Sequence, residues 1–227
     1  MNPIDRDAAA RRILDDLTPV RRLSRPWQRA VPVVALGLVM AAAVYLRFGV
    51  RHDAAALGRS VLWGLSALQM GYGVLLIAFA LRSAVPGRVL ARRLAAVLLL
   101  AGGGVVLSIT WLTWFAHASH VPAGLEAHYW TVCFRTPLAV GLPALILALV
   151  LAFRAYPTNP VLTGALAGLG AGLISDGSWR TYCEVSDPVH VLTSHAASVA
   201  LLTLTGILLA WLAARRAPVS LSATGTR

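Results

Sequence analysis

The chain has 227 residues, of which 58% are hydrophobic and only 13% are charged, and its mean hydropathy is +0.71. Because soluble domains carry about 25% charged residues, this composition excludes a water-soluble globular domain and predicts an all-α protein embedded in a lipid bilayer. The net charge of +11 comes from arginines that flank apolar segments, which we interpret as topology signals, so we expect no direct binding to nucleic acid.

The first 29 residues are polar and form the predicted N-terminal segment, 1–29. Asn2 and Pro3 can begin a short helix, in which Ile13, Leu14 and Leu17 form a partial apolar stripe. A basic run, PVRRLSRPWQR, completes the segment. The apolar stretch that follows is too long for a signal peptide, and no cleavage site is evident, so we expect the segment to be retained.

Six apolar segments follow, and a membrane-spanning helix needs about 20 residues. They cover approximately residues 30–46, 57–81, 94–115, 134–153, 161–174 and 189–213. The fifth is short and spans only if it extends to about Trp179; a re-entrant segment is the alternative. Its Gly164, Gly168 and Gly172 recur every four residues, a spacing typical of a close-packing helix face. We predict a six-helix membrane bundle over 30–213 and a polar tail over 214–227.

The distribution of arginine predicts the orientation of this bundle. Fifteen of the 20 arginines lie in the N-terminal segment, the second and fourth loops and the tail, and five lie on the other side. Positive charge accumulates on the cytoplasmic side of membrane proteins, so we expect both termini in the cytoplasm. All six histidines and both cysteines then lie on the outer side of the membrane.

The two cysteines, Cys133 and Cys183, are expected at the outer entrances of the fourth and sixth spans. Thiolate and imidazole are preferred ligands of zinc, cadmium and copper, and His128, Glu184 or His190 could complete a metal site. The thiols could instead respond to oxidants by forming a disulfide. A static structural disulfide, or two thiols that are unrelated to each other, would also fit the sequence.

One pair of histidines is poorly suited to joint metal binding. His190 and His195 are five residues apart, and residues with that spacing do not share a face of an α-helix. We therefore expect these two histidines to be a poor bidentate pair.

Four stretches of the chain carry a resemblance to a known family. They are LTPVRRLSRPWQRA before the first span, VCFRTPLAVGLP in the fourth, GALAGLGAG in the fifth and YCEVSDPVHVLTSHAASVALLTLTG leading into the sixth. Together they resemble the NrsF-type anti-sigma factors, six-span proteins of the bacterial inner membrane. The resemblance implies a cytoplasmic partner, an extracytoplasmic-function (ECF) sigma factor of the sigma-F type. It also implies that the two cysteines mediate a response to metal or oxidative stress.

We therefore expect a regulator and not an enzyme. The sigma factor is expected to bind the N-terminal segment, with the 82–93 loop as an additional candidate, and the predicted contacts are Ile13, Leu14, Leu17, Arg21, Arg22 and Arg25. The only cofactor expected is a transient heavy-metal ion at the cysteines. One alternative is a membrane thiol oxidoreductase, although such enzymes usually need a CxxC pair, which this chain lacks. A small metal or solute permease is a third candidate.

Overall fold

The computed structural model describes residues 8, 10–11, 14–15 and 24–216. In this part of the chain the regular elements are all helices, which confirms the predicted all-α class. Their bounds are α2 (Pro26–Phe48), α3 (Ala54–Leu57), the π-helix η1 (Ser60–Gly64), α4 (Leu65–Ser83), α5 (Arg92–Ala116), α6 (Glu126–Phe153), α7 (Pro160–Trp179), α8 (Pro188–His190), the π-helix η2 (Val191–Ala196) and α9 (Ala197–Arg216).

Five helical stretches are long and apolar enough to cross a membrane. They are Pro26–Phe48, Ser60–Ser83, Arg92–Ala116, Glu126–Phe153 and Pro188–Arg216. The predicted fifth segment is also helical and extends to Trp179, as a span requires, but it is not among these five. Its 20 residues correspond to a length of about 30 Å at 1.5 Å per residue.

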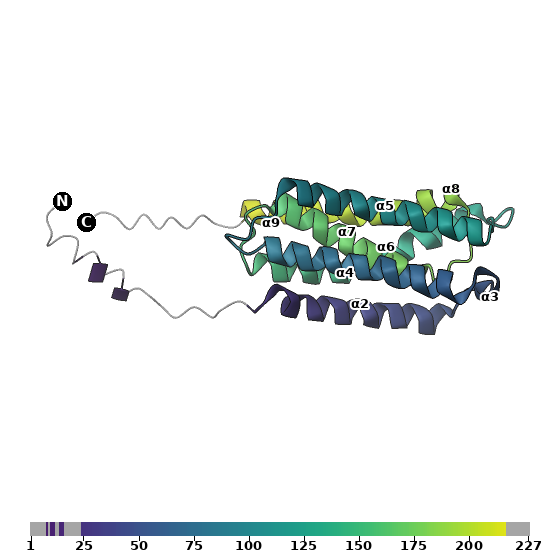
Figure 1. Ribbon diagram of the computed structural model, residues 1–227, viewed down its shortest axis with the longest axis horizontal. Coiled ribbons are helices and arrows are strands. Elements are labelled where there is room, and N and C mark those ends of the chain that lie inside the picture. Colours follow the sequence, from purple (N-terminus) through teal and green to yellow (C-terminus); the bar gives the residue numbers. More distant parts are fainter. Residues whose placement is uncertain (1–7, 9, 12–13, 16–23, 217–227) are drawn as a thin grey trace.

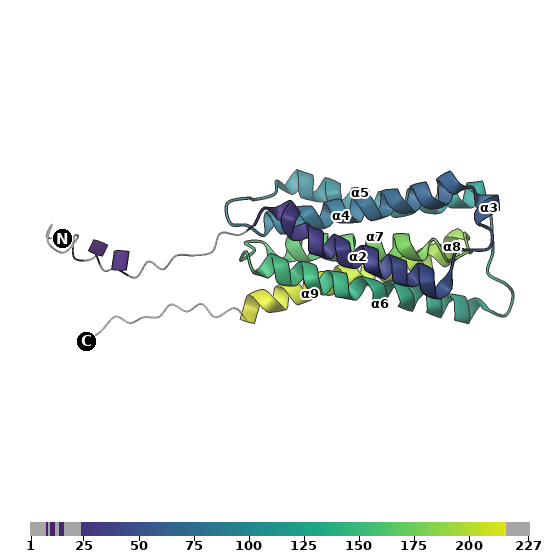
Figure 2. The ribbon, with the colours of Figure 1, turned by 90° about the horizontal axis from the view of Figure 1, so that it is seen from below.

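This helix, α7, lies at the centre of the bundle. Every residue from Thr163 to Trp179 is buried. It packs along α9 on one side and α4 on another, with α6 closing a third side, whereas α2 and α5 lie further out (Figures 1 and 2). The other long helices thus enclose α7.

Glycine allows this close approach. Gly164 lies against the backbone of Gly206 on α9, and Gly168 lies against Leu202 and Thr203. A Cβ atom at Gly168 would stand only 2.5 Å from the carbonyl oxygen of Leu202, so a larger residue cannot fit there without separating the helices. The predicted close-packing face of the fifth segment is therefore confirmed, and its partner is α9.

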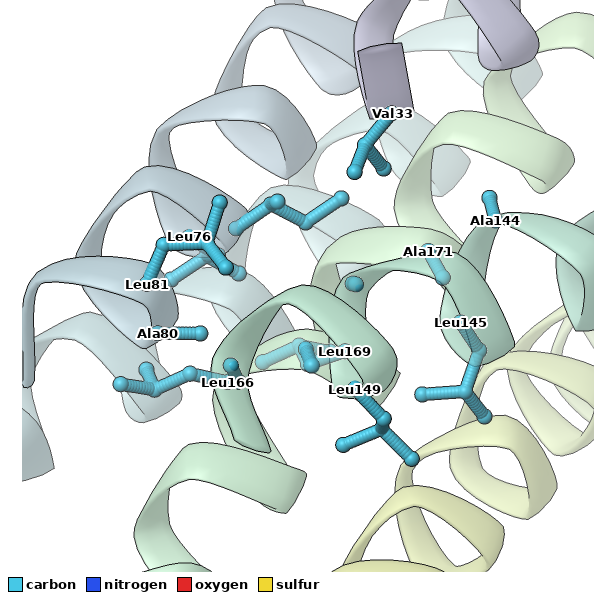
Figure 3. Packing of buried hydrophobic residues seen from close by; sticks show 14 of the residues in the cluster. Val33, Leu76, Ala80, Leu81, Ala144, Leu145, Leu149, Leu166, Leu169 and Ala171 are labelled. Atoms are coloured by element: carbon cyan, nitrogen blue, oxygen red, sulfur yellow. The ribbon is translucent and has the colours of Figure 1, made fainter. Parts of the chain in front are cut away.

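Apolar side chains divide between the interior and the outer surface of the bundle. Leu76, Leu145 and Leu166 are fully buried in the central cluster (Figure 3). Other large apolar residues, such as Leu100 and Leu204, are 76% and 62% exposed. A surface of this kind suits contact with lipid, which is as apolar as leucine.

The helix boundaries change one detail of the predicted arrangement. The fourth span begins at Glu126 and not near residue 134, so Cys133 lies two turns inside α6 instead of at its entrance. A carboxylate in the first turn favours this earlier start, because it interacts well with the positive end of the helix dipole. The third span ends at Ala116, within one residue of its predicted end, and His117 follows it.

The bundle has two chemically different ends. The start of α2 and the end of α9 lie at the same end (Figure 2). At the opposite end, the segments 49–59, 117–125 and 180–187 are joined by polar contacts. Arg51 Nη2 donates a 2.9 Å hydrogen bond to the Glu184 carbonyl, and the Ser119 amide donates to Ser186 Oγ at 2.9 Å. These contacts hold the segment containing Cys183 against the helix ends.

The α7–α9 contact can be tested by adding bulk. We expect Gly168→Val to lower the free energy of unfolding by about 1–3 kcal/mol or more, because its side chain would press on backbone that cannot rotate away. Gly104→Val is the matched control, since a Cβ there meets nothing within 4 Å. The measurement is the thermal unfolding midpoint of each variant in mild detergent; equal midpoints would contradict the packing described.

Candidate functional site

The two cysteines lie in contact although they are 50 residues apart in sequence. Cys133 comes from α6 and Cys183 from the segment that joins α7 to α8, and both are buried, free thiols. Their Sγ atoms are 3.4 Å apart. A disulfide requires about 2.05 Å, so the two sulfur atoms are in contact but not bonded to each other.

Burial changes the chemistry of Cys183. Its hydrogen bond with Cys133, together with desolvation, raises the pKa of the Cys183 thiol above its ordinary value. The thiol is therefore protonated at neutral pH and is a poor nucleophile until a metal ion or a base removes the proton.

Two histidines complete a compact group with the thiols. His190 Nε2 lies 3.8 Å from Cys183 Sγ, and the His190 and His195 rings are 5.7 Å apart. One ligand atom from each of Cys133, Cys183, His190 and His195 lies within 4.8 Å of the other three. All four side chains are buried.

The prediction that His190 and His195 point in different directions is wrong, and the π-helix is the reason. In an α-helix, residues five apart are separated by about 140° around the axis. The η2 segment, Val191–Ala196, instead forms wider π-turns with i→i+5 geometry, which brings residues five apart close to one another. The Ser194 hydroxyl donates to the His190 carbonyl at 2.6 Å and so gives that carbonyl a hydrogen-bond partner in the widened turn.

A buried carboxylate on α7 holds His195 in place. Asp176 on α7 is fully buried, and the ring nitrogen Nδ1 of His195 donates to its Oδ1 at 2.6 Å. Gln69 Nε2 on α4 donates to Oδ2 at 2.6 Å, and Arg180 Nε donates to the same oxygen at 3.2 Å. Arg180 also reaches Thr110 on α5 at 3.4 Å. One carboxylate thus links α4, α7 and η2 directly.

Polar residues within the apolar segments of the sequence give an indication of this network. An ionisable residue within an apolar helix is expensive unless it is paired, and it usually faces the interior of the bundle. Asp176 lies just beyond the predicted fifth segment, and Gln69 is a polar residue within the predicted second span. Pairing these two groups would have pointed to α4 as the neighbour of α7.

The other predicted ligands lie beside the four-residue group, not within it. His128 is exposed and Glu184 is half-buried, and both line a cavity of about 320 Å³ whose walls include Cys133 and Cys183. Glu184 Oε2 also lies 3.4 Å from Nδ1 of His52, whose side chain is 94% exposed. The cavity therefore gives the thiols a route to solvent.

The predicted sigma-factor contacts can be located only in part. Leu14 and Arg25 are exposed, and Arg25 immediately precedes α2. The remaining contacts lie outside the described residues: Ile13, Leu17, Arg21 and Arg22.

Comparison with known proteins identifies one family. The family model described as "Negative regulator of sigma F" (NrsF) matches residues 14–215. No curated protein and no solved structure matches the chain.

The ionised state of Asp176 has a measurable consequence for stability. We expect Asp176→Asn to lower the free energy of unfolding by about 3–5 kcal/mol, because it leaves the buried Arg180 without its counter-charge. Glu126→Gln, which neutralises an exposed carboxylate, is expected to cost no more than about 1 kcal/mol, the size of its interaction with the helix dipole. Denaturant unfolding in mild detergent measures both variants. A similar free energy for the two would show that Asp176 does not act as a buried counter-ion.

Proposed function

The chain belongs to the family of negative regulators of sigma F, and from this premise we propose that it is a membrane-bound anti-sigma factor for an ECF sigma factor. It holds the sigma factor at the cytoplasmic face of the bacterial inner membrane, with both of its own termini on that side. It releases the sigma factor when the cysteines on the outer side react with a metal ion or an oxidant.

The observation that carries this proposal is the contact between Cys133, in the second turn of α6, and Cys183, in the segment between α7 and α8. The start of α6 and α8 lie at the end of the bundle opposite the start of α2 (Figure 2). Two thiols that meet from separate elements can act as one unit, because a bond or a shared ion would tie α6 to the 180–187 segment. The partner-binding segment precedes α2 at the other end. Sensing and binding are thus separated along the bundle axis, as a signal that crosses a membrane requires.

The charge of the bundle supports a cytoplasmic partner at the end where α2 begins. Exposed arginines gather there from the helix ends and connecting loops: Arg25, Arg82, Arg88, Arg92, Arg93, Arg154, Arg215 and Arg216. The carboxylates of residues 24–216 all belong to the opposite half: Asp53, Glu126, Asp176, Glu184 and Asp187. A basic surface of this kind follows the positive-inside rule and suits an acidic surface on the sigma factor.

An apolar anchor completes the proposed binding surface. Leu14, with 64% of its surface exposed, belongs to the predicted stripe that includes Ile13 and Leu17. An exposed apolar stripe on a short helix can enter a groove of a partner, while neighbouring arginines steer the approach.

Removing residues 1–17 tests the partner-binding role. The truncated protein keeps Arg21, Arg22, Arg25 and Arg29 as topology signals, so we expect it to insert into the membrane normally. It should no longer hold the sigma factor, and the target genes should be constitutively expressed. Transcript levels measure the outcome, and detection of the protein in the membrane fraction is the control. Full repression by the truncated protein would place binding elsewhere, first of all in the 82–93 loop.

Serine substitutions test whether the cysteines act as one unit. We expect Cys133→Ser and Cys183→Ser each to abolish the response to metal or oxidant while repression is retained. The double substitution should add little, because residues that act together are not additive. Induction of a sigma-dependent reporter measures all three variants. Two different single phenotypes that sum in the double variant would mean that the cysteines act independently.

A further inference from the structure

We infer that Cys133, Cys183, His190 and His195 form a four-coordinate site for a thiophilic divalent cation of the zinc and cadmium class. The inference rests on the proposed function for its biological meaning, since it names the ligands through which the sensing end would detect a metal. Binding itself can be measured without the sigma factor.

The donor set indicates the class of ion. Two thiolates and two imidazoles in a closed, buried group are typical of tetrahedral zinc sites, and cadmium shares this preference for sulfur. Magnesium and calcium prefer oxygen ligands, which this group does not offer. An oxidant sensor based on a disulfide would need the two sulfur atoms alone and gives no role to the imidazoles.

Two of the distances between ligand atoms are close to those of a tetrahedral site. With zinc–sulfur bonds of about 2.3 Å, two sulfur ligands of a tetrahedral ion lie about 3.8 Å apart. The Sγ atoms of Cys133 and Cys183 are separated by 3.4 Å, and Cys183 Sγ lies 3.8 Å from His190 Nε2. These two pairs need shifts of only a few tenths of an ångström, and all four ligand atoms lie within 4.8 Å of one another, so side-chain rotation can bring them around one ion.

His195 supplies the most specific evidence. Its Nδ1 is engaged by Asp176, and its Nε2 is buried without a hydrogen-bond partner among the described residues. Buried polar atoms are almost always paired in native proteins, so an unpaired nitrogen beside two thiols needs an explanation. Metal-binding histidines regularly donate their other ring nitrogen to a carboxylate, which fixes the orientation of the ring and makes the ligand more basic. Asp176 would be the positioning residue in this arrangement.

Ion binding requires the release of protons and a route of entry. The cation replaces the protons of both thiols, and that of Nε2 where His195 is doubly protonated, and these protons leave to water. The cavity that reaches both cysteines carries His52, His128 and Glu184 on its walls. These three groups are weaker or more exposed ligands, and they can pass an ion inward by ligand exchange.

The experiment uses the purified full-length protein in mild detergent, reduced, with Co²⁺ as the spectroscopic probe. We expect one Co²⁺ per chain, with a sulfur-to-cobalt charge-transfer band and the intense ligand-field bands of tetrahedral cobalt. Added Cd²⁺ or Zn²⁺ should displace it. His190→Gln and His195→Gln should each weaken binding by at least about 10–100-fold, the loss typical even for a group that only supports a ligand.

Matched controls separate the four ligands from their neighbours. His128→Gln and Glu184→Gln change the cavity wall by equivalent substitutions and should leave cobalt affinity within about twofold. Elution volume and melting temperature without metal show whether each variant is folded. If His195→Gln fails to fold because it disturbs Asp176, then His190→Gln, which leaves the Asp176 hydrogen bonds intact, decides the matter.

Three outcomes would overturn the site. The first is that the protein binds no cobalt. The second is that bound cobalt gives a weak spectrum without the sulfur-to-cobalt charge-transfer band. The third is that cobalt binds through sulfur but neither histidine substitution lowers the affinity. In each case the truncation experiment could still support the anti-sigma function. Conversely, full repression by the truncated chain together with intact cobalt binding would count against the proposed binding segment and leave the metal site standing.

Discussion

The close contact between the backbones of α7 and α9 sets the geometry of the whole bundle. Gly164 and Gly168 allow the helices to meet without intervening side chains, and this fixes how far one helix is shifted along the other. At that register Asp176 faces His195, and the chain leaving α7 places Cys183 beside Cys133. The position of the cysteine–histidine group is therefore set by helix packing, and a change in one alters the other.

Asp176 carries the second structural constraint. A carboxylate in an apolar interior is tolerated only when its charge and its hydrogen bonds are satisfied together, and here α4, η2 and the end of α7 supply the donors. The network therefore joins the end of the bundle that carries the cysteines to α4, whose C-terminal end leads into the basic loop before α5. A change in the position of His195 would alter the hydrogen bonds of Asp176 and, through them, its contact with α4. Within residues 24–216, His195 is the one side chain that donates to Oδ1 of Asp176.

Much of the architecture follows from the sequence, because apolar length and glycine spacing are local properties. They predicted the helical class, the boundaries of most helices to within a few residues and the packing face of α7. The partners of single polar groups could not be predicted in the same way. The pairing of Asp176 with Gln69 and His195 depends on tertiary register. The proximity of His190 and His195 depends on a π-helix, for which the sequence offers no simple pattern. The early start of α6 was missed because its first turns are polar.

The position of α7 has a consequence for how the protein is made. The ribosome completes α7 before α9 exists, so the newly made helix has Gln69 and Arg180 beside Asp176 but lacks both His195 and the surface that its glycines fit. Until α9 packs, this helix exposes a carboxylate and a groove of bare backbone to its surroundings. An interrupted chain would display the same defect permanently. The central helix therefore differs between finished and unfinished molecules, because only in the finished protein do its glycine face and the Asp176 carboxylate have all their partners.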